Sequence, residues 1–497
     1  MRRVAALLLI LSSVSLAQGI RISGSSRTEY WIYSDSLNEH LEERLILGAR
    51  YKDLRLSTTL FAWDTTRTLD PYRFLDYLIE YKSEDVNFGY GSFYQTFGRG
   101  LILRAYFDED FKREKKLKGL KAGIHKFNSS LMVLSARSRN LFFEENLYVV
   151  KNDTTDELRG ANLDTRIKLP YYLTFIPDGN INIGLGGSYI RMNQIDDMSR
   201  KAFTEIYGGR VQPMIGPIDL YVEYAQLLGT RDMVGGRIKG SGLYSSATIT
   251  SSGIGITGEY MRYDSIGYGG FGYRYNDPPT PIRQGASANR GMDEVGWSGS
   301  VDISPLSNVH LEGSVGNIED TPGRVGAFEI TSKLKAEPND YWVTEAYYER
   351  HIEKRIDPTY DRKTSDKPGF EITYSWNMSD YFDLGYAIDF INEDGFKYNE
   401  QTLEIGYGRS PNIAFALRYT LRSRLKFNRI TSEELVEREH LGTNYGWLIF
   451  EAHLDLSRST TLRLAYGGEK GGLVCSGGVC RWEEPFDGLK AVLITRF

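Results

Sequence analysis

The last residues of the chain, Leu489-Lys490-Ala491-Val492-Leu493-Ile494-Thr495-Arg496-Phe497, decide its fold. Leu489, Ala491, Leu493 and Thr495 share one parity with the terminal Phe497, and both charged residues of the stretch fall on the other. Period two is the repeat of a β-strand, because successive side chains point to opposite faces. A strand that ends on an aromatic residue behind an export signal is typical of an outer-membrane β-barrel.

The N-terminus has the layout of a secretory signal. Arg2 and Arg3 precede an apolar run from Val4 to Leu11, and Ser15-Leu16-Ala17 is a small-residue cleavage site. The apolar run is too short to span about 30 Å of hydrocarbon. We therefore expect a signal peptide over residues 1–17, a single barrel over residues 18–497, and an outer-membrane location in a Gram-negative cell.

The composition fits a barrel and excludes some classes of function. The chain has 34 Tyr, 23 Phe, 7 Trp and 51 Gly residues, and no stretch has the ~18 apolar residues of a membrane helix. Barrels lack such stretches because only alternate residues face lipid. The 65 acidic residues exceed the 60 basic ones, which argues against a nucleic-acid binder.

Strand periodicity recurs along the whole chain. The apolar face of one segment is Phe382, Leu384, Tyr386, Ile388 and Phe390, and the residues between them include Asp383 and Asp389. Similar segments are 218–224, 370–376, 413–419 and 462–466. Polar residues opposite an apolar face are what the inner face of a water-filled barrel requires.

Turn signals indicate the number of strands. Short turns are expected near Lys52-Asp53, Ser83-Glu84, Asn128-Ser129, Pro170–Gly179, Met214–Gly216, Ser251-Ser252, Ser304–Ser307, Glu337-Pro338, Met378–Asp380, Ser410-Pro411 and Arg458-Ser459. They define eleven hairpins, and one strand before them and one after them give 24 strands, within a range of 20 to 26. Long polar stretches separate the hairpins. The sequence therefore predicts an all-β, antiparallel transmembrane barrel with short periplasmic turns and long extracellular loops.

The most distinctive internal segment is Gly89-Tyr-Gly-Ser-Phe-Tyr-Gln-Thr-Phe-Gly-Arg-Gly-Leu-Ile-Leu-Arg-Ala-Tyr106. Residues 96–118 are expected to form the third external connection, yet Leu101-Ile102-Leu103 is too apolar for a loop in water. One interpretation folds this connection into the lumen and forms a pore constriction with Arg99, Arg104, Tyr106, Asp108 and Glu109. The alternative is that residues 101–106 are a further wall strand. The charged run 112–118 is expected to be a solvated turn of helix or loop.

Residues 91–106 resemble the signature of an uncharacterised family of exported proteins found mainly in Bacteroidetes and related bacteria. The stretches Tyr275-Asn276-Asp277-Pro278-Pro279-Thr280 and Asp293-Glu294-Val295-Gly296 resemble further features of that family. The resemblance implies an outer-membrane barrel and no activity. After Tyr106 the chain continues with a charged run that is expected to depart from the family pattern, so the resemblance implies no shared role for that run.

Two further features have competing interpretations. The Gly/Tyr/Pro-rich stretch 264–292 is either a compact external loop without a ligand or a loop that binds a glycan or partner by aromatic stacking. Cys475 and Cys480 enclose four residues and predict a disulfide in an exported protein, with a metal pair as the alternative.

The sequence contains no motif for catalysis, a cofactor or a metal site. Its six histidines are scattered, and it has no Gly-x-Ser-x-Gly, His-Glu-x-x-His or phosphate-loop motif. We therefore expect a protein that is not an enzyme. Its expected partners are outer-membrane lipid, lipopolysaccharide and, through the strand ending at Phe497, the barrel-assembly machinery.

Two functions are compatible with these observations. The first is a porin-like channel for small hydrophilic solutes, and the second is a non-conducting barrel that anchors surface or secretion components. Strand periodicity begins by Ile22, so we expect no N-terminal globular plug and no active siderophore uptake.

Overall fold

The computed structural model describes residues 19–34, 39–65, 68–69, 73–108, 113–144, 147–151, 157–169, 181–195, 201–230, 237–267, 275–282, 293–321, 323–354, 362–377, 379–423, 425–431, 434–440, 445–470, 472–476, 479–483 and 486–497. The predicted signal peptide (residues 1–17) and the predicted turn Pro170–Gly179 lie outside these ranges.

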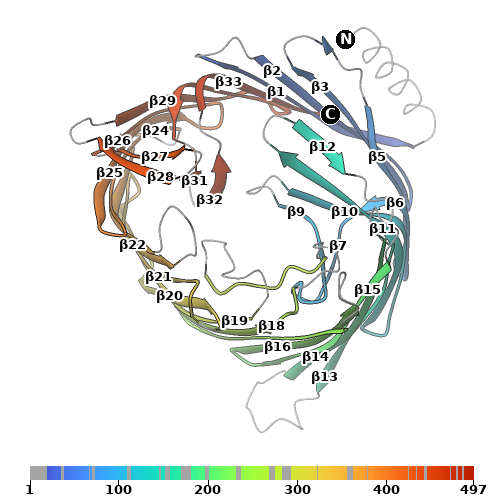
Figure 1. Ribbon diagram of the computed structural model, residues 1–497. Coiled ribbons are helices and arrows are strands. Elements are labelled where there is room, and N and C mark those ends of the chain that lie inside the picture. Colours follow the sequence, from blue (N-terminus) through green and yellow to red (C-terminus); the bar gives the residue numbers. More distant parts are fainter. Residues whose placement is uncertain are drawn as a thin grey trace.

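Twenty-four antiparallel strands form one ring, which Figure 1 shows along its axis. In ring order they are β1 (Arg21–Tyr33), β2 (Glu39–Tyr51), β3 (Leu54–Thr65), β5 (Arg73–Lys82), β6 (Val86–Phe93), β10 (Arg113–Lys126), β11 (Ser129–Glu144), β13 (Glu157–Leu169), β14 (Ile181–Ile195), β15 (Lys201–Ile215), β16 (Ile218–Thr230), β17 (Arg237–Ser251), β18 (Ile254–Asp264), β19 (Glu294–Leu306), β20 (Val309–Asp320), β21 (Gly326–Asn339), β22 (Trp342–Lys354), β23 (Arg362–Ser375), β24 (Asp380–Glu393), β25 (Phe396–Arg409), β26 (Ile413–Arg422), β29 (Tyr445–Ser457), β30 (Thr460–Glu469) and β33 (Phe486–Arg496).

The first and last strands close the ring. β33 pairs with β1 from Ser25↔Arg496 to Tyr33↔Gly488. Gly24 and Phe497 then exchange two backbone hydrogen bonds of 2.8 and 3.0 Å. Closure matters because lipid offers no hydrogen-bonding partner to an exposed strand edge. The predicted 24-strand antiparallel barrel is confirmed.

The two faces of the ring differ as the periodicity predicted. On β33, Leu489 and Leu493 are 37% exposed on the outer surface, whereas the inward Val492 between them is 6% exposed. The outward residues Ile413, Phe415, Leu417 and Tyr419 of β26 continue this apolar surface. The described residues include no helix with the length and apolar composition needed to cross a membrane.

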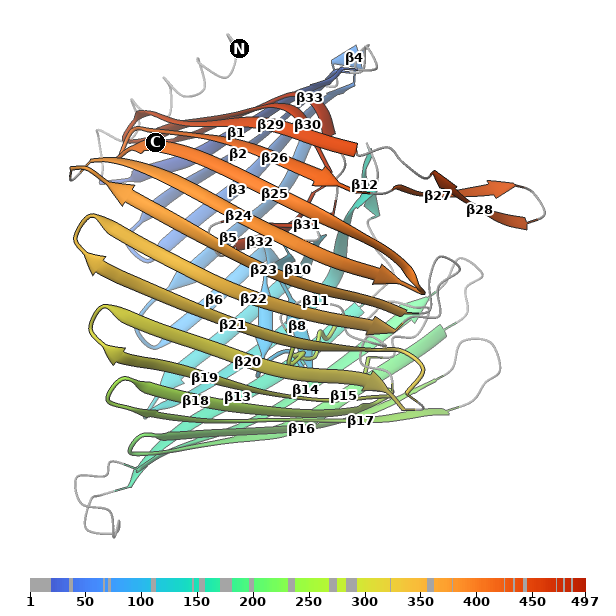
Figure 2. The ribbon, with the colours of Figure 1, turned by 90° about the vertical axis from the view of Figure 1, so that its left-hand side faces the viewer.

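Within the described residues, the connections at one end of the ring are turns of a few residues, whereas most of the longer connections lie at the other end (Figure 2). The two-residue turn between β24 and β25 is a short connection at that second end. The predicted short turns in the described residues join the expected pairs of strands. One turn is displaced: Glu337 and Pro338 belong to β21, and the chain reverses at Asp340-Tyr341. Pro338 lies at a register shift between Ala336 and Asn339. Proline is tolerated there because the ladder does not need a backbone N–H from this residue.

Nine shorter strands extend or accompany the ring. β4 (Thr68–Leu69), β9 (Phe107–Asp108) and β12 (Leu147–Lys151) lengthen wall hairpins. The others pair only with each other: β7 (Gln95–Phe97) with β8 (Leu103–Ala105), β27 (Leu425–Thr431) with β28 (Glu434–His440), and β31 (Gly472–Ser476) with β32 (Val479–Glu483). Figure 2 shows β27 and β28 projecting beyond the long-loop end, whereas both views place β31 and β32 within the ring.

Gly488 lies in the pairing of β33 with β1 that closes the ring, at a position where an added methyl group would destabilise the fold. Its φ is +151°, and a Cβ there would lie 1.9 Å from the carbonyl oxygen of Ile32 on β1. We expect Gly488→Ala to destabilise the folded barrel by roughly 2–3 kcal/mol, measured by denaturant unfolding in detergent. Gly299→Ala is the control, because a Cβ at Gly299 meets no atom within 4 Å. Equal stability of the two variants would contradict the close approach of Gly488 to β1 as the cause of the destabilisation.

Candidate functional site

The chain between β6 and β10 turns into the ring. β7 and β8 form a two-stranded sheet of their own, with Phe97 opposite Leu103, and Figure 1 shows β7 inside the barrel. Residues 101–106 are therefore not a wall strand, and the alternative interpretation is wrong. The connection also ends earlier than expected, because β10 begins at Arg113 and includes most of the run 112–118. That run is neither a helix nor a loop.

The inward segment, residues 95–106, is anchored by apolar packing. Phe97, Leu101, Ile102 and Leu103 are fully buried. They share one cluster with inward side chains of the wall, including Leu158, Ile190, Ile206, Leu227, Met261 and Tyr263. This burial removes from water the apolar residues that had no place in an exposed loop. The cluster lies inside the ring against wall strands between β6 and β20.

A second inward segment, residues 275–282, lies on the first. Arg104 N donates to the carbonyl of Tyr275 at 2.8 Å, and Asp277 N donates to that of Gly100 at 3.0 Å. The buried Asn276 side chain donates to the carbonyls of Leu101 and Ile266 at 3.0 and 2.8 Å. This part of the stretch 264–292 is therefore not an exposed surface loop, contrary to expectation. The Asn276 bonds lock two loops that are remote in sequence.

Arg99 lies at the tip of the inward segment against β16 and β17. Its guanidinium lies 4.4 Å from the ring centroid of Tyr221 and donates to Tyr244 Oη at 3.0 Å. Its backbone N–H donates to Glu223 Oε2 at 2.9 Å. A Cβ at Gly98 would lie 2.2 Å from Glu223 Oε1, and the φ of Gly98 is +57°. Only glycine lets the turn approach this buried carboxylate so closely.

Arg104 forms a second cationic point on the same segment. Its guanidinium lies 4.2 Å from the ring centroid of Tyr106 and 3.6 Å from Asp277 Oδ2. Tyr106 Oη donates to that same carboxylate oxygen at 2.5 Å. The Arg104 side chain is still partly exposed, so part of its charge faces water. The structure thus brings three of the five predicted constriction residues onto one inward segment.

The two acidic members of the predicted constriction are only partly described. Asp108 pairs with Arg113 through the backbone at the start of the β9–β10 ladder. The Asp108 side chain and all of Glu109 lie outside the described residues.

The opposite wall carries a polar inner face. Arg418 on β26 contacts Glu404, Glu451 and Glu469 at 2.9, 3.1 and 3.0 Å. Lys470 binds Glu400 at 2.6 Å, and Arg422 binds the same carboxylate. Two of these carboxylates, Glu404 and Glu451, are 36% and 31% exposed, as water in the lumen would require.

The predicted Cys475–Cys480 disulfide is compatible with the backbone. The two residues lie directly opposite each other in the β31–β32 ladder. Their side chains lie outside the described residues, so the disulfide stays a prediction.

Sequence reasoning missed the groups that hold the inward segment. Glu223 falls on the polar parity between Val222 and Tyr224, which signals an inward side chain but not its partner. Asn276 carried no such signal. Its two acceptors are carbonyl groups, which no side-chain pattern reveals.

A family described as a family of unknown function, DUF6029, matches residues 42–271 and 456–497. The chain belongs to this family. The matched residues include the signature 91–106 and the closing strand, whereas the stretches 275–280 and 293–296 lie beyond the first matched range. The predicted membership of an uncharacterised family is confirmed. With its closed ring and apolar outer surface, the protein is an outer-membrane β-barrel.

Comparison with solved structures shows proteins of similar fold. No curated protein matches the chain. It is similar to the siderophore receptor PirA from Pseudomonas aeruginosa (10% identity, TM-score 0.46, covering 96% of this chain and 80% of that one). It is similar also to the FrpB iron transporter from Neisseria meningitidis (9% identity, TM-score 0.44, covering 96% of this chain and 82% of that one). A further similar structure is the copper transporter OprC (10% identity, TM-score 0.44, covering 96% of this chain and 81% of that one). These likenesses assign no solute or partner to the chain.

Proposed function

We propose that this barrel is a porin-like channel for small hydrophilic solutes, narrowed by the inward segments 95–106 and 275–282. The supporting observation is the asymmetry of its interior. The buried apolar cluster lies against wall strands between β6 and β20 beside the inward segments, whereas partly exposed charges lie elsewhere on the inner face, on β21 to β30 and near the turn between β19 and β20. A ring of this size is too wide for wall side chains to fill, so water occupies what the inward segments leave.

Arg99 and Arg104 give the narrowed passage a local positive charge. Fixed charges at a constriction favour ions of opposite sign. We expect Arg99→Gln with Arg104→Gln to lower the anion-to-cation permeability ratio by about twofold, measured as a reversal potential across planar bilayers under a salt gradient. Glutamine avoids adding a carboxylate beside Glu223 or Asp277.

Arg458→Gln is the matched control, because Arg458 lies exposed in the turn between β29 and β30. A shift of equal size in this variant would show that selectivity follows overall charge and not the inward segment. Absence of conductance from the native protein at any voltage would refute the channel proposal.

The second candidate function is a non-conducting scaffold for surface or secretion components. It is favoured by the inward position of β31 and β32 in addition to the two inward segments (Figure 1). This function requires a sealed lumen and a partner that stays bound when the protein is purified in mild detergent. A purified protein with ohmic conductance and no bound partner would exclude it.

A further inference from the structure

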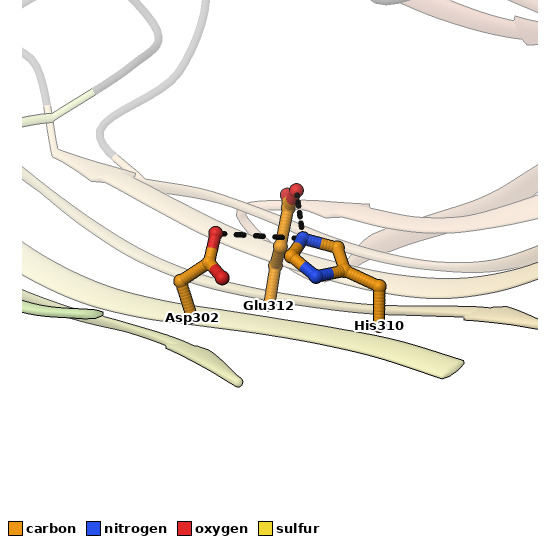
Figure 3. Close-up of side chains that lie close together, drawn as sticks. All are labelled: Asp302, His310 and Glu312. Carbon is orange, nitrogen blue, oxygen red and sulfur yellow. Dashed lines mark hydrogen bonds and ion pairs between the residues drawn. The ribbon is translucent and has the colours of Figure 1, made fainter. Parts of the chain in front are cut away.

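A separate group of side chains lies near the short turn that joins β19 to β20. Asp302 is on β19, and His310 and Glu312 are on β20, with Asp302 directly opposite Glu312 in the ladder. Leu311, between the two β20 residues, is exposed on the outer surface. Alternation therefore places His310 and Glu312 on the inner face. Figure 3 shows the three side chains pointing toward one another.

The three side chains converge at distances that suit one ion. His310 Nε2 lies 3.0 Å from Glu312 Oε1 and 3.4 Å from Asp302 Oδ2. One ligand atom from each residue lies within 4.8 Å of the other two. Ligands about 2.0–2.1 Å from a tetrahedral zinc ion are separated from one another by roughly 3.3 Å. Small side-chain rotations therefore bring all three atoms onto a shared ion.

The surroundings of His310 orient its ring. Its Nδ1 lies 3.0 Å from Ser304 Oγ, a contact that holds Nε2 toward the two carboxylates. The group facing it from the next strand is Lys335 on β21, directly opposite His310 in the ladder. Lys335 Nζ lies 2.9 Å from Glu337 Oε1, so its charge is engaged by a carboxylate outside the cluster.

Beside the cluster lies a cavity of about 170 Å³, lined by Ser304, Ser307, Asn308, Val309, His310, Lys335 and Glu337. This is room for several water molecules, each taking up about 30 Å³. A metal ion with three protein ligands completes its coordination with water, as open sites do. The cavity borders the cluster at His310 and leaves room for water beside it.

We propose that Asp302, His310 and Glu312 bind a divalent transition-metal ion at the periplasmic side of the lumen. One imidazole and two carboxylates, with no thiolate, favour zinc and borderline ions such as cobalt and nickel over soft copper(I). The ion also compensates the two carboxylates that face each other across neighbouring strands. The site is independent of conduction, because it requires only the β19–β20 hairpin.

The test is calorimetric titration of Zn²⁺ into the purified, tag-free full barrel in detergent. We expect about one Zn²⁺ per chain, and an affinity that falls at least roughly tenfold in His310→Ala and in Glu312→Gln. Co²⁺ in place of Zn²⁺ should give visible absorption bands that both variants lose. Heat-modifiable electrophoretic mobility shows that each variant is folded.

His453→Ala is the matched control. His453 lies 3.5 Å from Asp455 with the same His-x-acid spacing, but within the described residues it belongs to no group of three ligands. Its loss should leave Zn²⁺ affinity unchanged. The proposal is overturned if the native barrel binds no Zn²⁺, if His310→Ala binds as tightly as the native protein, or if His453→Ala weakens binding equally.

Discussion

Replacing residues 94–112 with a four-residue Gly/Ser linker should raise single-channel conductance by roughly twofold or more. The linker removes Phe97, Leu101, Ile102 and Leu103 from the lumen and leaves the β6–β10 ladder, which ends at Phe93↔Leu117, in place. The passage widens because the removed segment is a folded body inside the ring and not part of the wall. The measurement is the unit conductance in planar bilayers.

Two variants sharpen this result. Shortening the β27–β28 hairpin, residues 425–440, is the comparison, because that hairpin lies past the long-loop end and not between the wall strands (Figure 2), so its loss should change conductance less than the linker replacement. Gly98→Val keeps the segment but places side-chain atoms against Glu223, so it should release the inward turn and raise conductance by a smaller amount. Unchanged conductance after the linker replacement would mean that the segment does not limit flow.

Lys116→Met should destabilise the barrel by about 3–5 kcal/mol. Lys116 Nζ lies 2.6 Å from Asp76 Oδ2, and their side chains are only 9% and 8% exposed. The pair joins β10 to β5, two strands that β6 separates in the ring. Removing the ammonium leaves a buried carboxylate without this counter-charge, and that desolvation is costly. The measurement is the free energy of unfolding in denaturant.

The double variant Lys116→Met/Asp76→Leu should recover most of the lost free energy of unfolding. Apolar groups of similar size then replace the pair, and no charge is left buried without its partner. Arg137→Met is the comparison for an exposed pair. Arg137 lies 3.8 Å from Glu157, with side chains 60% and 44% exposed, so its loss should cost less than about 1 kcal/mol. If the double variant is as unstable as Lys116→Met, the loss of stability comes from altered packing and not from the unpaired Asp76 carboxylate.

Much of the wall could be predicted because strand physics is local. Alternation fixed which face of β24 and β33 meets lipid, and turn chemistry placed the hairpins closely enough to count them. The displaced turn at Glu337-Pro338 shows the limit of that reasoning. Proline signals a break in the ladder, but here that break is a register shift between Ala336 and Asn339 within β21, and the chain reverses only after it, at Asp340-Tyr341.

The interior was harder to predict, because it depends on contacts between remote segments. The apolar run Leu101–Leu103 indicated burial, and this was enough to suggest an inward fold. It did not indicate the partner loop 275–282, which the sequence presented as an external surface loop. The charges of the run 112–118 suggested solvent, yet Lys116 is buried because Asp76 from another hairpin reaches it.

The sequence by itself determined an outer-membrane barrel of 24 antiparallel strands, since each strand carries its own period-two pattern and lipid demands closure. Only the tertiary structure decided what lies inside the ring. The inward segments and the Arg99–Glu223 contact join residues from different hairpins, and the Asp302–His310–Glu312 group joins the two strands of one hairpin. Their geometry follows from the register and curvature of the closed wall, which no single strand encodes.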